Sequence, residues 1–193
     1  MQPTVQTYFT YKDYLLWDDA KRYELIRGIR IEMLPAPSRR HQTISGNVYF
    51  HLRTYMAGKG VPCQLFVAPF DVRLPRLSSD PDKNEVFTVV QPDLCIVCDP
   101  SKLDERGCLG APDLVVEILS KNSKYDVEDK FELYEEAGVK EYWIIHPEEE
   151  TLTVFRLDEK GQFSGGRIFS NQAEVKPSIF EDCTIDMKKV FEH

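Results

Sequence analysis

The sequence predicts an α/β fold in which helices cover a mixed β-sheet, and three observations lead to this class. Residues 114–119 form an apolar run typical of a strand buried on both faces. Apolar side chains at helical spacing follow in residues 126–137, and another strand-like run follows in residues 141–146. A strand, a crossover helix and a second strand imply at least one parallel strand pair.

Two short elements are predicted near the N-terminus. Residues 10–13 have capping-box spacing ahead of an aromatic and leucine-rich stretch, which predicts a short helix ending near Asp18. Residues 23–26 and 29–34 are strand-like and flank Arg27-Gly28, so they predict a β-hairpin.

The next predicted elements are a long helix and two strands. Apolar side chains recur at helical spacing over residues 39–57, after the capping residue Ser38, and Gly58 is expected to end this helix. The strands follow at residues 63–74, with a bend at Pro69, and at residues 89–98. The element order is therefore helix, three strands, helix and strand, with hairpins added at both ends.

We expect one domain, because no low-complexity stretch or Pro/Gly/Ser-rich linker divides the chain. The polar residues 75–85 predict a mobile surface loop. Residues 151–157 and 163–170 predict a C-terminal hairpin. The domain spans residues 1–193 and consists of an N-terminal helix and hairpin (1–37), a core (38–147) and a C-terminal hairpin with a tail (148–193).

The composition predicts a globular cytoplasmic protein without membrane association. The hydrophobic fraction is 42% and the charged fraction is 29%, which suits a chain that buries a core. The N-terminus lacks a basic segment followed by an apolar one, and no apolar run is long enough to cross a bilayer.

The five cysteines also favour a reducing compartment, because their number is odd and two lie inside a strand-like run. Cys95 and Cys98 form a CxxC pattern, which suits zinc or redox chemistry. No second CxxC or HxxxH follows at zinc spacing, so small apolar side chains in a buried strand are the favoured interpretation.

The net charge of −8 argues against simple binding to nucleic acid, which is itself densely negative. Residues 20–60, however, contain eight basic and two acidic side chains, a local charge of +6. This asymmetry can form one basic face on an acidic body, although solvated surface charge is the commoner explanation for any single window.

Glu117 is the most informative residue, because an ionised carboxylate inside an apolar strand must be paired, protonated or bound to metal. Asp93 follows Pro92 at the start of the preceding strand, where a neighbouring strand can bring the two carboxylates together. Such a pair suits Mg²⁺ or Mn²⁺. Alone, Asp93 is also explained as a residue that starts a strand.

Lys130 belongs to the apolar stripe of the second predicted helix and is therefore expected to face the sheet. Turned inward, its ammonium can stabilise a nucleophilic water or the charge that develops on a phosphate. An i,i+4 ion pair with Asp126 is the other interpretation of the same position, and both remain open.

Beyond these patterns, the chain resembles the Uma-two family, restriction-endonuclease-like proteins within the PD-(D/E)xK nuclease superfamily. The resemblance spans nearly the whole chain. It rests on residues 23–28 (YELIRG), His41, 68–74 (APFDVRL), 91–93 (QPD), 111–120 (APDLVVEILS), Asp126, Lys130, Tyr134, Gly138 and 141–143 (EYW).

The resemblance implies a restriction-endonuclease-like core in which Asp93 and Glu117 are metal ligands. The superfamily's lysine stands two residues after the glutamate, a position that Leu119 occupies here. The resemblance makes Lys130 the substitute, from the following helix. 

The same resemblance suggests that Glu24 and His41 complete the catalytic site. His41 is otherwise explained as an exposed residue at a helix start. Asp71 and Asp113 are further candidate carboxylates, and both also suit turns because prolines lie near them.

The leading functional hypothesis is a Mg²⁺-dependent endonuclease that hydrolyses phosphodiester bonds of DNA, with Mn²⁺ as an alternative ion. Arg39 and Arg40, with Lys59 as a further candidate, are expected to contact the phosphates beside the site. Besides DNA, a second copy of the chain, forming a homodimer, is the partner we consider.

Two rival hypotheses remain. The first is a catalytically inactive protein of the same fold that binds nucleic acid or a protein partner, and the absence of lysine at position 119 motivates it. The second is a structural module whose acidic residues form only a surface cluster.

Overall fold

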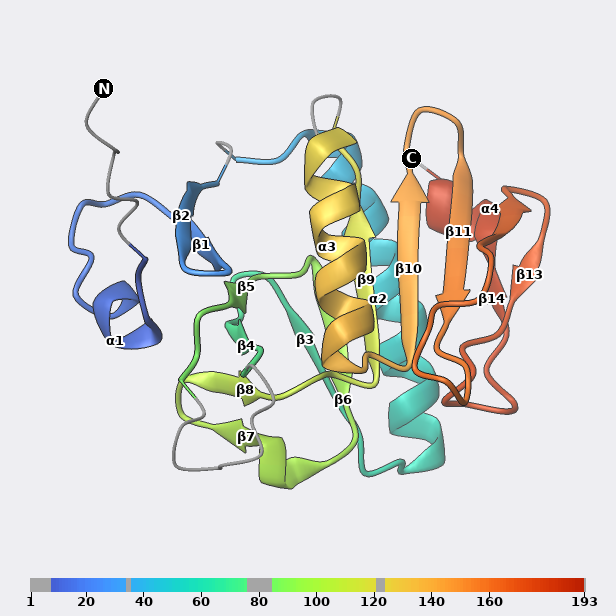
Figure 1. Ribbon diagram of the computed structural model, residues 1–193. Helices are drawn as coiled ribbons and strands as arrows, with labels where there is room; N and C mark the ends of the chain where they lie inside the picture. The colour runs from blue at the N-terminus through green and yellow to red at the C-terminus, as the bar shows by residue number, and fades with distance from the viewer. Residues whose placement is uncertain (1–7, 34–35, 76–84, 121–123, 193) are drawn as a thin grey trace.

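The computed structural model describes residues 8–33, 36–75, 85–120 and 124–192, and within α3 it describes side chains from residue 129 onward. These residues form two six-stranded mixed sheets, a two-stranded sheet and a small set of helices (Figure 1). The helices are α1 (Tyr11–Tyr14), α2 (Arg39–Lys59), the 3₁₀ turn Pro100–Lys102, α3 (Lys124–Ala137) and α4 (Met187–Phe191).

The larger part of the core surrounds a sheet with the strand order β12-β11-β10-β9-β6-β3. Its strands are β3 (Gln64–Val67), β6 (Leu94–Val97), β9 (Leu114–Ile118), β10 (Glu141–His146), β11 (Thr151–Arg156) and β12 (Arg167–Ser170). Strands β9 and β10 are parallel and are joined by α3, whereas all other pairs are antiparallel. The predicted strand–helix–strand unit with a parallel pair is confirmed.

A second sheet has the order β2-β1-β5-β4-β8-β7, with β4 parallel to β8. Its strands are β1 (Tyr23–Ile26), β2 (Ile29–Glu32), β4 (Val72–Arg73), β5 (Val89–Val90), β7 (Leu103–Asp104) and β8 (Gly107–Leu109). The remaining pair is β13 (Glu174–Val175) with β14 (Ile185–Asp186).

The prediction that residues 63–74 and 89–98 each form one strand is wrong. Each segment divides between the two sheets, the first into β3 and β4 and the second into β5 and β6. Pro69 and Pro92 lie in the connections. Because proline has no backbone N–H to donate to a ladder, a strand tends to stop there.

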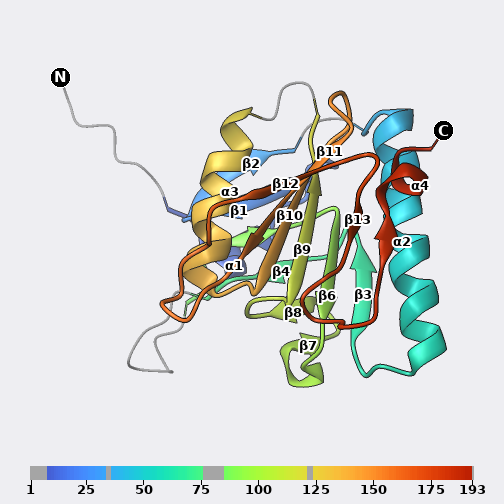
Figure 2. The same cartoon turned by 90° about the vertical axis from the view of Figure 1, so that its right-hand side faces the viewer.

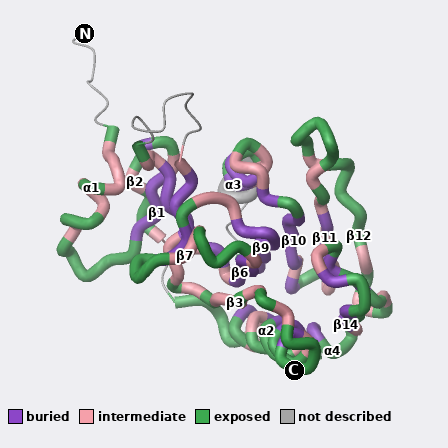
Figure 3. Tube along the Cα trace, turned by 90° about the horizontal axis from the view of Figure 1, so that it is seen from below, coloured by how far each residue is buried: buried purple, intermediate pink, exposed green. Residues whose placement is uncertain are grey.

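Strand β9 separates two hydrophobic cores. Its side chains alternate, so that Leu114, Val116 and Ile118 belong to the core that α2 covers, and Val115 belongs to the core that contains residues of α3 and of the second sheet. Figure 2 shows α2 and α3 on opposite sides of this sheet. The central strands β6, β9 and β10 are the buried middle of the molecule in Figure 3.

The local signals at the helix ends are largely confirmed. Thr10 and Asp13 form the predicted capping box, although α1 has only four residues. The side chain of Ser38 accepts the N–H of His41 at the start of α2. This helix continues past Gly58 and ends at Gly60, whose φ of 62° is the left-handed conformation that favours glycine.

Several short elements were not predicted, namely β7, β8, β13, β14 and α4, which have two to five residues each. The predicted surface loop falls largely on residues 76–84, which lie outside the described residues. Across the described part of the chain, no helix is long and apolar enough to span a membrane.

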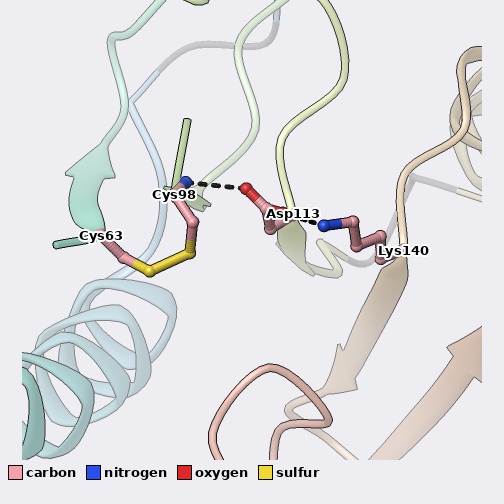
Figure 4. The surroundings of a disulfide bond; sticks show 4 residues. All are labelled: Cys63, Cys98, Asp113 and Lys140. Carbon is pink, nitrogen blue, oxygen red and sulfur yellow. Dashed lines mark hydrogen bonds and ion pairs between the residues drawn. A yellow bond between two sulfur atoms is a disulfide. The ribbon is translucent and has the colours of Figure 1, made fainter. Parts of the chain in front are cut away.

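The interpretation of Cys98 as a small apolar side chain is wrong, because it forms a disulfide with Cys63 (Figure 4). The bond joins residues that flank the paired strands β3 and β6. The backbone N–H of Cys98 donates to Asp113 over 2.7 Å, and the Lys140 ammonium donates to the same carboxylate over 2.6 Å. Cys95 remains a buried free thiol within β6, as expected.

Candidate active site

The candidate site lies where the two sheets meet. The short segment from Gln91 to Asp93 connects β5 of one sheet to β6 of the other. Leu94 of β6 pairs with Val116 of β9, which puts Asp93 at the level of Glu117 near the carboxyl end of β9. Adjacent strands therefore place Asp93 and Glu117 at the same level, and the charge of Asp93 raises the pKa of Glu117.

Glu117 faces α3 across the sheet. Its Oε1 atom accepts hydrogen bonds from Lys130 Nζ over 3.1 Å and from the Tyr134 hydroxyl over 2.8 Å. The side chains of Lys130 and Glu117 are only 6% and 12% exposed. Lys130 therefore points inward, as its place in the apolar stripe indicated.

Glu24 reaches the same lysine from β1. Its Oε1 atom lies 3.0 Å from Lys130 Nζ and accepts the backbone N–H of Gln91 over 2.7 Å. The Glu24 side chain is 4% exposed. One buried ammonium is thus shared by two buried carboxylates that come from different sheets.

Asp93 and His41 form the other half of the site. The Oδ2 atom of Asp93 lies 3.1 Å from His41 Nε2 and accepts the backbone N–H of Ile118 over 2.7 Å. His41 is buried at the start of α2, and its Nδ1 atom has no hydrogen-bond partner among the described residues. The carboxylate of Asp93 is therefore fixed from both α2 and β9.

Burial dominates the electrostatics of the site. The pKa of Glu117 is raised to about 8. Burial is the largest cause, Lys130 and Tyr134 oppose it, and the charges of Asp93 and Glu24 act in the same direction as burial. The hydrogen bond and charge of Asp93 outweigh burial at His41, so the His41 pKa is raised. Glu24 and Glu117 thus share Lys130, Asp93 pairs with His41, and the raised pKa of Glu117 means that this carboxyl binds its proton more tightly than a solvent-exposed glutamate does.

The donor set fits a hydrated divalent cation. The described residues contain no group of three or more His, Cys, Asp or Glu side chains arranged to hold a metal ion. Asp93 Oδ1 and Glu117 Oε2, however, make no hydrogen bond within the described part of the chain, and Asp93 is 20% exposed. Mg²⁺ commonly binds through one or two carboxylates and keeps several waters.

The structure brings together all five residues that were proposed as catalytic and separates the additional carboxylates from them. Asp113 precedes β9 at the opposite end from Glu117 and pairs with Lys140. Asp71 accepts hydrogen bonds from the Tyr14 hydroxyl and from the Gln91 side chain. Neither hydrogen-bonds the five residues.

The expected phosphate-binding arginines differ in their surroundings. Arg39 is exposed beside His41 at the start of α2. Arg40 instead pairs with Glu150 at 2.6 Å and donates to the Pro147 carbonyl, so it holds α2 to the turn after β10. Lys59 lies at the other end of this 21-residue helix, roughly 30 Å from Arg39, so its expected place beside the site is wrong.

The basic window at residues 20–60 is also not one continuous face. Five of its eight cations pair with carboxylates, namely Lys21, Arg27, Arg30, Arg40 and Lys59. The prediction of a single basic surface fails because partners from distant segments neutralise most of these charges.

Two participants were not predicted as site residues. Tyr134 stands four residues after Lys130, so the two share one face of α3, and this spacing was the available signal. Gln91 contributes through its backbone N–H, which no side-chain pattern reveals.

Comparison with solved structures places this arrangement within a known class of fold. The chain matches a crystal structure described as a putative nuclease belonging to DUF820 from Anabaena variabilis ATCC 29413. The TM-score is 0.73 at 21% sequence identity, and the match covers 95% of this chain and 97% of the other. The shared fold is the mixed α/β architecture described above.

The family model of Uma2, described as "Putative restriction endonuclease", matches residues 11–188. The chain therefore belongs to the Uma2 family, the Uma-two family that its sequence resembles. None of the curated proteins compared with the chain matches it.

Proposed function

We propose that this protein is a metal-dependent endonuclease that hydrolyses phosphodiester bonds of DNA. The observation that carries the proposal is the buried Glu117, which shares Lys130 with Glu24 and lies at the level of Asp93. Because the pKa of the buried Glu117 is raised to about 8, its ionised form does not stabilise the folded protein, and a functional role explains its position better. Membership of the Uma2 family supports the same class of reaction.

Asp93 and Glu117 are the residues that would hold Mg²⁺ or Mn²⁺, through the oxygens that accept no hydrogen bond from the described residues. When bound, such an ion supplies Lewis acidity and a water of lowered pKa. Its charge would also favour the ionised form of Glu117.

The surrounding side chains have separate tasks in this proposal. Lys130 donates hydrogen bonds to the attacking water or to the phosphate oxygens, where negative charge develops. Tyr134 and Glu24 hold Lys130 and Glu117 in place through the contacts given above. His41 fixes the orientation of the Asp93 carboxylate.

A nuclease-fold protein that binds nucleic acid or a protein partner without cutting it is the second candidate. One observation favours it, namely that Leu119 occupies the expected lysine position and is partly buried against the core. The inward Lys130 replaces that lysine in our proposal, so the two candidates differ in whether Lys130 acts in hydrolysis.

Divalent-metal titration with a thermal-shift readout tests the site. Millimolar Mg²⁺ or Mn²⁺ is expected to raise the melting temperature of the wild type by several degrees, and Asp93→Ala is expected to abolish the shift. Asp113→Ala is the matched control, because that carboxylate lies at the other end of β9, and it should keep the shift. A wild type without any shift would count against the metal site.

A further inference from the structure

We propose that a hollow next to the carboxylate cluster binds one unpaired nucleobase of a DNA single strand, together with its phosphate. This inference rests on the proposed function and specifies its substrate. The hollow has a volume of about 170 Å³. It is lined by Tyr14, Trp17, Lys21, Arg22, Tyr23 and Gln91.

Its walls are aromatic. The ring centroid of Trp17 lies 5.3 Å from that of Tyr14 and 5.4 Å from that of Tyr23, with interplanar angles of 59° and 72°. These three rings are inclined to one another. Tyr14 also stacks on Tyr11, and Trp17 also contacts Phe9 edge to face, so the hollow is lined by the ring surface that these contacts leave. Aromatic side chains bind unpaired bases in this way, because every base has a π-face.

Two of these aromatic rings, Trp17 and Tyr23, already make a cation–π contact with an arginine. The Arg30 guanidinium lies 3.7 Å from the centroid of Tyr23 and 4.6 Å from that of Trp17. Because Arg30 does not line the hollow, the ring surface that faces the hollow is a separate one.

The rim is cationic. Arg22 is exposed and donates to the neutral Gln91 side chain over 2.6 Å, and no carboxylate neutralises it within the described residues. Lys21 adds a second cation, although it pairs with Glu32 at 2.8 Å. Stacking walls with a positive rim match the two parts of a nucleotide.

Gln91 connects the hollow to the carboxylate cluster. Its backbone N–H donates to Glu24, and its side chain lines the hollow and donates to the Tyr14 hydroxyl over 3.1 Å. Tyr23 and Glu24 are consecutive residues of β1, so their side chains point to opposite faces of that strand. The two sites are thus neighbours across one strand.

This arrangement selects an unpaired strand. In a duplex each base is stacked on both faces and paired along its edge, so it must be extruded before it can enter such a hollow. A single strand presents its bases directly, and Gln91 lies between the hollow that takes the base and Glu24 of the candidate active site.

Tryptophan fluorescence provides a direct test, because the chain has two tryptophans and Trp143 is 1% exposed. A twelve-nucleotide oligodeoxyadenylate is titrated into metal-free protein, with its duplex and with dAMP as comparisons. We expect saturable quenching by the single strand and by dAMP, and at least tenfold weaker binding of the duplex. In Trp17→Phe, fluorescence anisotropy of a labelled strand should show retained binding without quenching.

Variants make the test specific. Trp17→Ala and Arg22→Ala should each weaken single-strand binding by about tenfold, since the first removes a stacking surface and the second a cation for the phosphate. Arg22 is exposed, so its variant stays informative if Trp17→Ala fails to fold. Phe50→Ala, at a 64% exposed aromatic on α2, is the control and should bind normally.

Either of two results would overturn the inference: equal binding of strand and duplex, or normal binding by Arg22→Ala. Failure of the proposed function has a different pattern. Quenching by the single strand without any cleavage would support the hollow and contradict the hydrolase. Cleavage by the wild type without Trp17 quenching would support the hydrolase and contradict the hollow.

Discussion

The carboxyl group of Glu117 sits in an apolar strand, next to Lys130 and Tyr134, with its pKa raised to about 8 by burial. An acid with a raised folded-state pKa binds its proton more tightly in the folded state than in the unfolded chain. The contribution of Glu117 to folding stability is then fully present below the unfolded pKa, near 4.5, and is lost as the pH rises towards 8.

Glu117→Gln should remove this dependence. In metal-free protein we expect the variant to be as stable as the wild type near pH 5 and more stable at pH 8, because the amide carries no charge to bury. Urea unfolding at pH 5, 6, 7 and 8 measures the difference. A variant that is unfolded at all four values would show that Glu117 is a required partner of Lys130, contrary to a ligand held ready for a cation.

Removing Lys130 is expected to lower the free energy of unfolding more than removing an exposed cation that also pairs with α3 or with residues near β1. Lys130→Met leaves Glu24 and Glu117 buried without their cation, which should cost about 3 kcal/mol of unfolding free energy at pH 8. Arg27→Ala is the control, since Arg27 joins β1 to α3 through the exposed Glu132 and Glu136. That loss should stay below about 1 kcal/mol, and equal losses in chemical denaturation would refute the buried pairing.

At the scale of single residues, the sequence was most informative where a charged side chain stood among apolar ones. Glu117 in an apolar strand and Lys130 in an apolar helical stripe both indicated the site. Glu24 and His41 lie in ordinary patterns, and only the family resemblance suggested them. Their contacts, to Lys130 and to Asp93, join residues far apart in the chain, which local patterns do not encode.

Among the elements, β3 and β6 are joined by the Cys63–Cys98 disulfide, which closes a loop with a sequence separation of 35 residues. By loop-closure entropy such a crosslink stabilises the folded state by about 4 kcal/mol. A reductant should therefore lower the melting temperature of the wild type and leave that of Cys63→Ala/Cys98→Ala unchanged. Equal melting curves of oxidised and reduced wild type would contradict this.

Arg39 and Arg40 are adjacent on α2 but should respond differently to removal. Arg40→Ala loses a half-buried pair with Glu150 and a bond to the Pro147 carbonyl, so we expect about 1 kcal/mol of lost stability. Arg39→Ala should leave stability unchanged and, if Arg39 contacts a phosphate, reduce the salt slope of DNA binding by about one unit.

Binding isotherms at four salt concentrations, together with denaturation curves, separate the two roles. If Arg40→Ala changed only the salt slope, the ion pair with Glu150 would not be structural. If Arg39→Ala left the slope unchanged, this end of α2 would not be part of the DNA interface.

Strand pairings and helix caps were predicted correctly where they depend on residues close together in the sequence. The parallel pair of β9 and β10, the hairpin of β1 and β2, and the cap of α2 all follow from short-range patterns. The division of residues 63–74 and 89–98 between two sheets does not, because β4 and β5 have only two residues each. Their pairing depends on partners distant in sequence.

At the scale of the whole molecule, the candidate site forms where the chain passes from β5 of one sheet to β6 of the other. Gln91 and Asp93 flank Pro92 at this crossing, and they contact Glu24 of one sheet and Ile118 of the other. The class of fold was predictable from the alternation of elements, whereas the existence of two sheets was not. Family membership accounts for the architecture, and the convergence of carboxylates on one lysine supports the proposed chemistry.

The most direct measurement of that chemistry is cleavage of a labelled DNA strand, at pH 8 with millimolar Mg²⁺ or Mn²⁺, by the wild type and by Asp93→Asn and Asp113→Asn. We predict metal-dependent cleavage by the wild type and by Asp113→Asn, and a loss of at least a hundredfold in Asp93→Asn, a change of about 2.7 kcal/mol in the barrier. A wild type that binds DNA without cutting it under any of these conditions, or Asp93→Asn that cuts at the wild-type rate, would contradict the proposal.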